Sequence, residues 1–213
     1  MDALEAYVGL KRPQTKQLLS DTPLIAVDFE TTGLDYNQDE IIAMGFCPID
    51  QGIIRLANCS YFVVQPRQLL KSDNVVIHGL MDDHVSDGIS QQQAMQKFLE
   101  LTKGKTIVAH YHTIEKYFIQ KAARQIFGQT IPLSILDTFN IAERQMRRRN
   151  QPISANSLRL FNLRKQFGLP NYNAHNALED AISTAELFLA QIASLNMAKK
   201  QLRLASLGLI KSD

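Results

Sequence analysis

The sequence lacks a long apolar run, a strong net charge and any low-complexity segment, and each absence narrows the class of protein. No stretch approaches the ~18 apolar residues of a membrane-spanning helix. The 23 Lys and Arg residues nearly balance the 21 Asp and Glu residues, so the net charge is only +2 and any nucleic acid must bind to a local patch. Internal repeats and Gly/Ser-rich linkers are also missing. These absences predict one globular domain with no membrane partner.

The length and composition agree with that prediction. The 213 residues suffice for one sizeable core, and 45% hydrophobic with 21% charged residues is typical of a soluble globular protein. We expect a helical extension at 1–20, the main domain at 21–196 and a tail at 197–213. The first residues lack the basic-then-apolar order of a signal peptide, which predicts a cytoplasmic protein.

Only two cysteines are present, too few for a zinc site built from cysteines. They fall on the two strands of an expected hairpin that turns near Asp50-Gln51-Gly52. In that register Cys47 faces a residue near Arg55, about 13 Å of strand away from Cys59, whereas a disulfide needs Cα atoms within ~7 Å. We therefore interpret both cysteines as plain core thiols.

Hydrophobic periodicity and turn residues predict a mixed sheet flanked by helices, an α/β fold. A first strand ends near Thr31, and two apolar, β-branched runs at Glu40–Cys47 and Ile53–Val64 form the hairpin. These three strands are expected to be antiparallel. Helices are expected at four further places, namely 2–20 (interrupted by Pro13), Gln91–Leu101, 137–170 (with breaks) and 176–196.

The second half of the sheet is expected to be parallel. Short apolar strands at Thr106–Ala109 and Pro132–Leu136 flank a helix at Thr113–Phe127. Strand–helix–strand order implies a parallel pair with a helical crossover. The sequence therefore predicts five strands, the first three antiparallel and the last two parallel.

The first strand ends in two carboxylates. Side chains alternate along a strand, so Asp28 and Glu30 share one face, about 7 Å apart at Cα. Like charges at this spacing repel unless a cation lies between them, and oxygen ligands suit Mg²⁺ or Mn²⁺. Taken alone, such a pair is more often two solvated acids at a strand end. The next residues, Thr31-Thr32-Gly33, offer hydroxyls, amides and a backbone that a nucleotide can approach closely.

A third candidate carboxylate belongs to Glu115, the single acidic residue between Glu100 and Asp137. It lies in the first turn of the helix after the fourth strand, where the helix macrodipole favours a carboxylate in any case. The fourth strand is expected beside the first, which would bring Glu115 towards Asp28.

A fourth candidate, Asp180, follows a helix start signal. Asn176 and Glu179 have the N-x-x-E spacing of a capping box, so the helix is expected to begin at Ala177 with Asp180 in its first turn. Within one helix His175 and Asp180 would point about 140° apart. A shared site therefore requires His175 to precede the helix, as the cap predicts. Alone, His175 is more often a surface histidine and Asp180 a solvated helix residue.

In combination these residues resemble a known family. Asp28–Gly33 is similar to the first motif of the DEDDh 3′–5′ exonucleases, which include the proofreading epsilon subunit of DNA polymerase III, ribonuclease T and oligoribonuclease. Val108–Glu115 resembles the second motif, HNxxFD, and His175–Asp180 the third, H-x-x-x-x-D. The His-Gly of Ile77–Leu80 matches a further family feature. The resemblance covers roughly residues 22–195.

The departures from the family lie in the second motif. The family Asp, Asn and Phe are here Glu115, Tyr111 and Ile114. Glu keeps the charge and adds one methylene, a reach of about 1.5 Å, which ligation through water tolerates. In the third motif Asn176 stands where a sister class has tyrosine, so that class is disfavoured.

The resemblance implies a ribonuclease H-like fold and two-metal phosphodiester hydrolysis, which releases nucleoside 5′-monophosphates from a 3′ end. It implies two divalent ions, Mg²⁺ or Mn²⁺, with His175 as the general base. The implied metal ligands, which also count as catalytic residues, are Asp28, Glu30, Glu115 and Asp180. The implied substrate-binding residues are Thr31, Thr32, Gly33, Leu34 and His78, although His78 is equally compatible with a structural role.

The implied partners are single-stranded 3′ ends of DNA or RNA, and a DNA polymerase or repair assembly. No residue discriminates DNA from RNA. The alternative function is a catalytically weak or inactive nucleic-acid-binding module on the same fold.

Two further segments are ambiguous. The basic cluster Arg144–Asn150 is either a phosphate-binding patch or a solvated helix end, where cations are favoured. Gln201–Ala205 loosely resembles the Gln-Leu-x-Leu-Phe peptides that bind sliding clamps, but it lacks the final aromatic residue, which favours packing on the domain instead.

Overall fold

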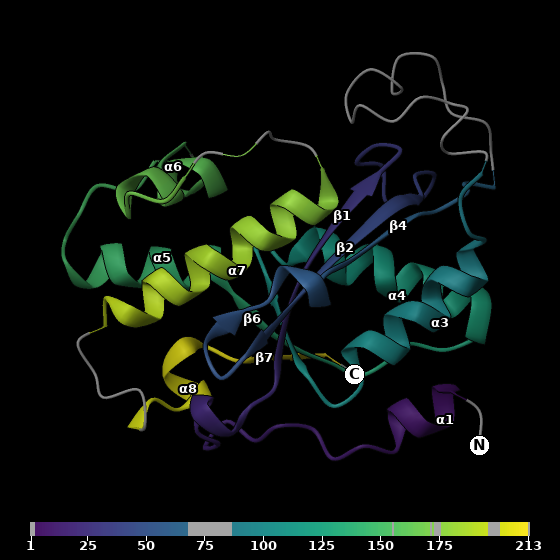
Figure 1. Cartoon of the computed structure of the whole chain (residues 1–213), viewed down its shortest axis with the longest axis horizontal. Coiled ribbons are helices and arrows are strands. Elements are labelled where there is room, and N and C mark those ends of the chain that lie inside the picture. Colours follow the sequence, from purple (N-terminus) through teal and green to yellow (C-terminus); the bar gives the residue numbers. More distant parts are fainter. Residues whose placement is uncertain are drawn as a thin grey trace.

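A mixed sheet with β1 at its centre organises the protein (Figure 1). The computed structural model describes residues 3–67, 87–154, 156–170, 172, 176–195 and 201–212. Within these ranges seven strands pair in the order β3-β2-β1-β5-β6-β7, with β4 also paired to β2. The strands are β1 Leu24–Thr31, β2 Ile41–Asp50, β3 Ile53–Ile54, β4 Ser60–Val63, β5 Thr106–Ala109, β6 Leu133–Asp137 and β7 Ile210–Ser212.

The directions of the strands confirm the predicted α/β fold. The strand β1 runs antiparallel to β2 and parallel to β5, and β5 runs parallel to β6. Two features were not predicted. The second hairpin strand is divided into β3 and β4, and the C-terminal segment adds β7, which runs antiparallel to β6.

The division of the hairpin corrects the predicted relation of the two cysteines. A 3-10 turn, η2 (Leu56–Asn58), separates β3 from β4. It shifts the register, because β2 pairs Ile49 with Ile54 on one side of the turn but Phe46 with Ser60 on the other. One further step in the second register sets Cys47 opposite Cys59. The two cysteines therefore do not lie about 13 Å apart along the strand, as predicted from the sequence.

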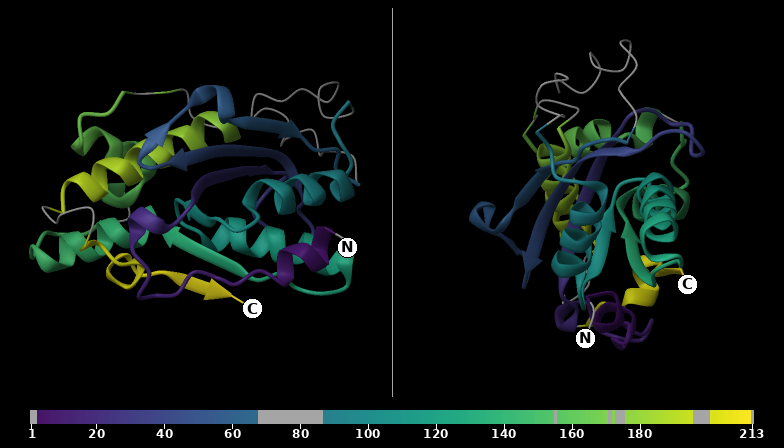
Figure 2. Two further views of the ribbon diagram at one scale, coloured as in Figure 1. Left: turned by 60° about the horizontal axis from the view of Figure 1, so that its bottom comes forward. Right: turned by 90° about the vertical axis from the view of Figure 1, so that its right-hand side faces the viewer.

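Helices cover both faces of the sheet (Figure 2). The helices α3 (Gln91–Thr102) and α4 (Thr113–Phe127) pack on one face, and α7 (Ala177–Ala193) crosses β1 and β2 on the other. The α4 bounds are those predicted, and α3 and α7 differ from prediction by a few residues at their ends. The remaining helical segments are α1 Ala3–Val8, η1 Leu19–Asp21, α5 Thr138–Arg148, η3 Asn156–Leu158, α6 Leu160–Gln166 and α8 Leu204–Leu207.

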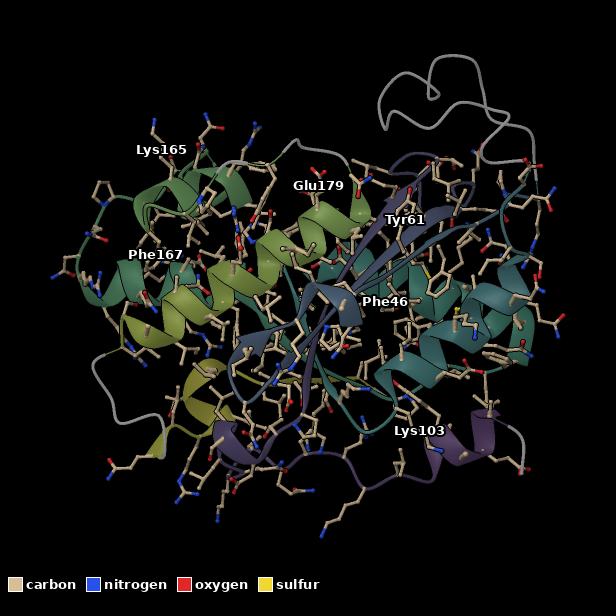
Figure 3. The ribbon with its side chains drawn as sticks, viewed as in Figure 1. Phe46, Tyr61, Lys103, Lys165, Phe167 and Glu179 are labelled. Carbon is tan, nitrogen blue, oxygen red and sulfur yellow. The ribbon has the colours of Figure 1, made fainter. Side chains whose placement is uncertain are left out.

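Alternation along β1 sorts its side chains between two cores. Ile25, Val27 and Phe29 join the core under α3 and α4. There Phe29 meets Phe46 edge to face at a ring-centroid distance of 6.5 Å; Phe46 is labelled in Figure 3. Leu24 and Ala26 join the core under α7. The predicted face assignment is therefore confirmed, and the next residues on the α7 side are Asp28 and Glu30.

A buried arginine ties α6 to α7. Arg164 has no exposed surface, and its guanidinium donates to the Ser183 and Pro170 carbonyl oxygens at 2.7 Å each and to Glu186 Oε2 at 2.8 Å. The ring of Tyr172 stacks over the same guanidinium, 5.0 Å from its centroid. A buried charge requires such partners, because isolated burial of a charge is costly.

Both terminal segments pack on the same body. The predicted helix at 2–20 is shorter than expected: α1 ends at Val8, and the Gly9 amide donates to Glu5. Leu202 and Leu204 are buried in the core under α7, which confirms that this segment packs rather than presenting a free peptide. Among the described residues, no helix is long and apolar enough to cross a membrane.

Candidate active site

The site lies at the end of β1, opposite the sheet end near the chain termini (Figure 1). Asp28 is half-buried and Glu30 is buried, and strand alternation points both towards the α7 side. Tyr61 on β4 lies at the same end of the sheet (Figure 3). Its pKa is raised by burial and by the nearby Glu30 carboxylate.

A glycine brings α7 onto the sheet beside Asp28. Gly45 pairs with Asp28 across the β1–β2 ladder. A Cβ built on Gly45 would lie 2.0 Å from the Ala177 carbonyl oxygen and 2.6 Å from the Leu178 amide nitrogen. Any larger residue would therefore push the first turn of α7 away from the two β1 carboxylates. The sequence reasoning missed Gly45, because a close approach between segments more than 130 residues apart leaves no local signal.

The first turn of α7 supplies the third carboxylate. Asn176 caps the helix, and its side-chain oxygen accepts from the Leu178 and Glu179 amides at 3.0 and 3.2 Å. This confirms the predicted helix start at Ala177. Asp180 then lies with Asp28 and Glu30 in one group, in which one carboxylate oxygen from each residue is within 4.8 Å of the others.

Electrostatic repulsion within this group is strong. The pKa of Asp28 is raised well above its ordinary value, first by burial and then by the charges of Glu115, Asp180 and Glu30. Three carboxylates that converge in a partly buried place destabilise one another unless a cation neutralises them. The donor set, which consists only of carboxylate oxygens, fits a hard divalent cation.

Glu115 lies outside this group of three, but its charge acts on Asp28. It is only 6% exposed, in the first turn of α4, and its Oε2 has no hydrogen-bond partner among the described residues. Burial, together with the charge of Asp137, raises the pKa of Glu115 to about 8, although a hydrogen bond from its own amide opposes the shift. A buried, unpartnered carboxylate oxygen that repels Asp28 is the observation expected of a ligand without its cation.

Asp137 holds the loop that leads to Glu115. Its carboxylate oxygens accept from the Tyr111 amide at 3.0 Å, the His112 amide at 3.2 Å and the Phe139 amide at 2.9 Å. Tyr111 has a φ of +65°, a left-handed conformation that suits asparagine or glycine better than tyrosine. Asp137 therefore holds the backbone of Tyr111 and His112 where the second motif turns into α4. Sequence reasoning placed Asp137 at a strand end but missed this role.

The His112 side chain also contacts Asp137. Its Nδ1 lies 2.6 Å from Asp137 Oδ2. Burial alone would raise the pKa of Asp137, but the hydrogen bonds from His112 and the Tyr111 amide outweigh it, so this pKa lies below its ordinary value. Burial lowers the pKa of His110 to about 4, which keeps that imidazole neutral while its Nδ1 lies 2.8 Å from the Thr138 hydroxyl.

The loop after β1 is organised by its own hydrogen bonds. The Thr31 hydroxyl donates to the Gly33 carbonyl oxygen at 2.8 Å, and the Thr32 hydroxyl donates to Asp39 Oδ1 at 2.7 Å. The position of a Gly33 Cβ lies 2.5 Å from Asp39 Oδ2, so glycine allows the loop to fold against Asp39. Leu34 next to it is 70% exposed. The loop that follows Glu30 therefore presents an exposed apolar side chain.

Two predicted site residues, His78 and His175, lie outside the described residues, as does the segment 76–80. The basic cluster is partly engaged within the protein. A Cβ on Gly208 would overlap the Arg144 guanidinium, so Arg144 packs on the C-terminal segment. Arg147 pairs with Glu143 at 2.8 Å. Arg148 and Arg149 are exposed at the end of α5.

The fold is ribonuclease H-like, and three of the four predicted carboxylates converge at the end of its central strand. A family model described as exonuclease, named for ribonuclease T, matches residues 25–188, and the chain belongs to this family of DEDDh exonucleases. The structure is similar to the nuclease domain of 3′hExo, a DEDDh family member, bound to rAMP. The TM-score is 0.69 at 15% identity, covering 88% of this chain and 98% of that one.

Relatives by sequence are bacterial DNA polymerase III proteins. The chain is 30% identical over 169 residues to the DNA polymerase III subunit epsilon of Treponema pallidum, which covers 79% of this chain and 75% of that protein. It is 29% identical over 171 residues to the PolC-type DNA polymerase III of Caldanaerobacter subterraneus subsp. tengcongensis, which covers 80% of this chain. The chain spans only 12% of that PolC-type relative.

Proposed function

We propose that the chain is a metal-dependent 3′–5′ exonuclease that releases nucleoside 5′-monophosphates from the 3′ end of single-stranded nucleic acid. The proposal rests on one observation above all. The carboxylates of Asp28, Glu30 and Asp180, which come from the first and third family motifs, converge within 4.8 Å. We assign the exonuclease unit to residues 21–196, with segments 1–20 and 197–213 packed around it.

In this proposal Asp28, Glu30, Glu115 and Asp180 would hold two divalent ions, Mg²⁺ or Mn²⁺. When bound, such ions stabilise the charge that develops on the oxygens of a phosphate undergoing in-line displacement. The protein's part is to hold the carboxyl groups near one another, although its raised pKa values at Asp28 and Glu115 oppose ionisation until a cation binds. Gly45 serves this by letting α7 approach β2, and Asp137 serves it by holding the turn before Glu115.

His175 is proposed as the general base. It precedes the Asn176 cap by one residue in the sequence. An imidazole has a pKa near neutrality, so one ring nitrogen can accept the proton of the attacking water at physiological pH. The 3′ oxygen of the shortened strand leaves and takes up a proton from solvent, and the imidazolium gives up its proton to solvent before the next cycle.

The terminal nucleotide is proposed to bind at the loop Thr31–Leu34, with His78 as a further contact. Because the Thr31 and Thr32 hydroxyls donate within the loop, their role is to fix its shape. The exposed Leu34 is the group suited to contact a base through its apolar surface. Apolar contact with a base face is tolerant of sequence, as an exonuclease requires.

The proposed substrates are single-stranded 3′ ends of DNA or RNA. The relatives named as DNA polymerase III proteins favour DNA, together with a polymerase or repair assembly as partner. The second candidate is a catalytically weak or inactive binding module. It is favoured by Glu115, Tyr111 and Ile114, which replace the usual residues of the second motif.

The experiment uses matched single-stranded DNA and RNA oligonucleotides labelled at the 5′ end, incubated with Mg²⁺, Mn²⁺ or a chelator. The expected result is a ladder of products shortened from the 3′ end, with either metal and not with the chelator. The proportion of DNA and RNA product then identifies the preferred substrate. Metal-dependent binding without shortening would contradict the exonuclease and support the binding module.

A further inference from the structure

The two cysteines of the chain lie across neighbouring strands. The β2–β4 register pairs Gly45 with Tyr61 and Phe46 with Ser60, so the next step sets Cys47 opposite Cys59. Both are free thiols. Facing residues of an antiparallel pair have Cα atoms about 4.5–5.5 Å apart, which is within the range that a disulfide spans.

The side chains, and not only the backbones, meet. Cys47 lies on the same face of β2 as Gly45, and both cysteines belong to the apolar cluster under α7. The two thiols share a hydrogen bond. The Sγ of Cys59 also lies 3.8 Å from the Arg55 carbonyl oxygen. The pair is therefore placed where a bond between the two sulfur atoms can form.

The two thiols differ in their access to solvent. Cys47 has no exposed surface, whereas Cys59 is half-buried at the end of η2. Burial, the Cys59 thiol and the Glu186 carboxylate raise the pKa of Cys47. Because the thiolate is the reactive form, a reagent in solvent is expected to react at Cys59 first, with Cys47 as the resolving thiol.

We propose that Cys47 and Cys59 form a reversible disulfide by exchange with a small disulfide such as oxidised glutathione. The Cys59 thiolate attacks one sulfur of the glutathione disulfide, which forms a mixed disulfide and releases one glutathione thiolate. Cys47 then gives up its proton and attacks the Cys59 sulfur, which forms the Cys47–Cys59 bond and releases the second glutathione. Two protein thiols are oxidised, one glutathione disulfide is reduced, and both thiol protons end on the released glutathione.

The crosslink would close the loop between Cys47 and Cys59, which contains β3 and η2. A disulfide that closes this loop lowers the conformational entropy of the unfolded chain. The oxidised protein is therefore expected to melt about 5 °C higher than the reduced protein. Dithiothreitol should reverse the shift. The readouts are thiol content and melting temperature, so the test is independent of nuclease activity and of the function proposed above.

The experiment incubates the folded full-length chain with reduced and oxidised glutathione, blocks free thiols under acid quench, and measures intact mass and linked peptides. The expected product has lost about 2 Da, contains a Cys47–Cys59 linked peptide and returns to the dithiol with dithiothreitol. A protein that keeps both thiols, or that accumulates only a glutathione adduct, would overturn the proposal.

Single variants test the order of the steps. Cys47→Ser should accumulate a stable glutathione adduct on Cys59, because the resolving thiol is gone. Cys59→Ser should leave Cys47 largely unmodified while the protein stays folded, as judged by circular dichroism. Equal adduct formation in the two variants would contradict the assignment of Cys59 as the entry thiol. The wild-type disulfide test stands even where a variant folds poorly.

Discussion

The candidate site has two halves, the group Asp28–Glu30–Asp180 and Glu115, and the fold positions them in different ways. Asp28, Glu30 and Asp180 are brought together by strand alternation and a helix cap, and they match the family motifs. Glu115 depends instead on a turn held by Asp137, which lies about 25 residues further along the chain. That second half also carries the substitutions at Tyr111 and Glu115. We expect the first half to set the chemistry, and the second half to adjust which ion the chain uses and how fast it works.

The largest expected effect belongs to the first half. Asp28→Ala or Asp180→Ala should lower hydrolysis by roughly 10³-fold or more, because each removes a carboxylate ligand and its charge. The fold should survive, because removal of a carboxylate relieves repulsion in the group. The measurement is the rate of shortening of a labelled oligonucleotide. The matched control is Asp50→Ala, an exposed carboxylate at the far end of β2, which should keep full activity. Near-wild-type activity of either site variant would contradict the assignment.

The next largest loss of activity is expected for His175→Ala. If His175 is the general base, its loss should slow the reaction about 10²–10⁴-fold while oligonucleotide binding is retained. The wild-type rate should rise with pH as the imidazole loses its proton, and this limb should vanish in the variant. A pH–rate profile at several substrate concentrations separates rate from binding. An unchanged profile at a similar rate would point to a different base.

Substitutions of Glu115 test whether the second half of the site determines the preference between Mg²⁺ and Mn²⁺. Its side chain reaches about 1.5 Å further than the family aspartate, so it is expected to displace hydration from the bound ion. Mg²⁺ gives up water reluctantly, and Mn²⁺ binds such sites more readily, so the wild type should work better with Mn²⁺. Glu115→Asp should narrow the difference between the ions, and Glu115→Gln should lose most activity with either.

The check is a titration of rate against each ion for the three proteins. Full activity of Glu115→Gln would remove Glu115 from the ligand set. An equal preference for Mn²⁺ in wild type and Glu115→Asp would show that the extra methylene is not its cause.

The smallest expected effect is on stability in the absence of metal. The pKa of Glu115 is raised to about 8 in the folded protein, from about 4.5 when unfolded. The folded state therefore holds a proton that the unfolded chain releases, and stability should fall as pH rises from about 4.5 to 8. Asp28, whose pKa is also raised, should add to the slope.

Glu115→Gln should flatten this dependence and stabilise the metal-free protein by about 4 kcal/mol at pH 8. Urea unfolding in chelator at several pH values measures both quantities. Added Mn²⁺ should stabilise the wild type more than the variant. A wild type whose stability is independent of pH across this window would contradict the burial of an uncompensated Glu115.

The parts that could be predicted from the sequence follow from local rules. Alternation assigned Asp28 and Glu30 to one face, and the Asn176 cap gave the start of α7. Periodicity gave α4 to the residue. Each of these depends on residues within a few positions of one another, so the signal is present in a short window.

The parts that could not be predicted depend on distant contacts. Gly45 is needed only because α7 packs against β2 at this position. Asp137, at the end of β6, accepts a hydrogen bond from the loop between β5 and α4. The cysteine register failed because the η2 turn inserts residues between β3 and β4, which no hairpin rule signals. The addition of β7 to the sheet likewise depends on pairing with β6, some 75 residues earlier in the chain.

The most direct test of a single four-carboxylate metal site is the number of Mn²⁺ ions bound. Calorimetric titration of Mn²⁺ in the presence of a nucleoside 5′-monophosphate should give two ions for the wild type. It should give one for Glu115→Gln, with the Asp28–Glu30–Asp180 group still occupied. Two ions of unchanged affinity in Glu115→Gln would contradict the claim that the two halves form one metal centre.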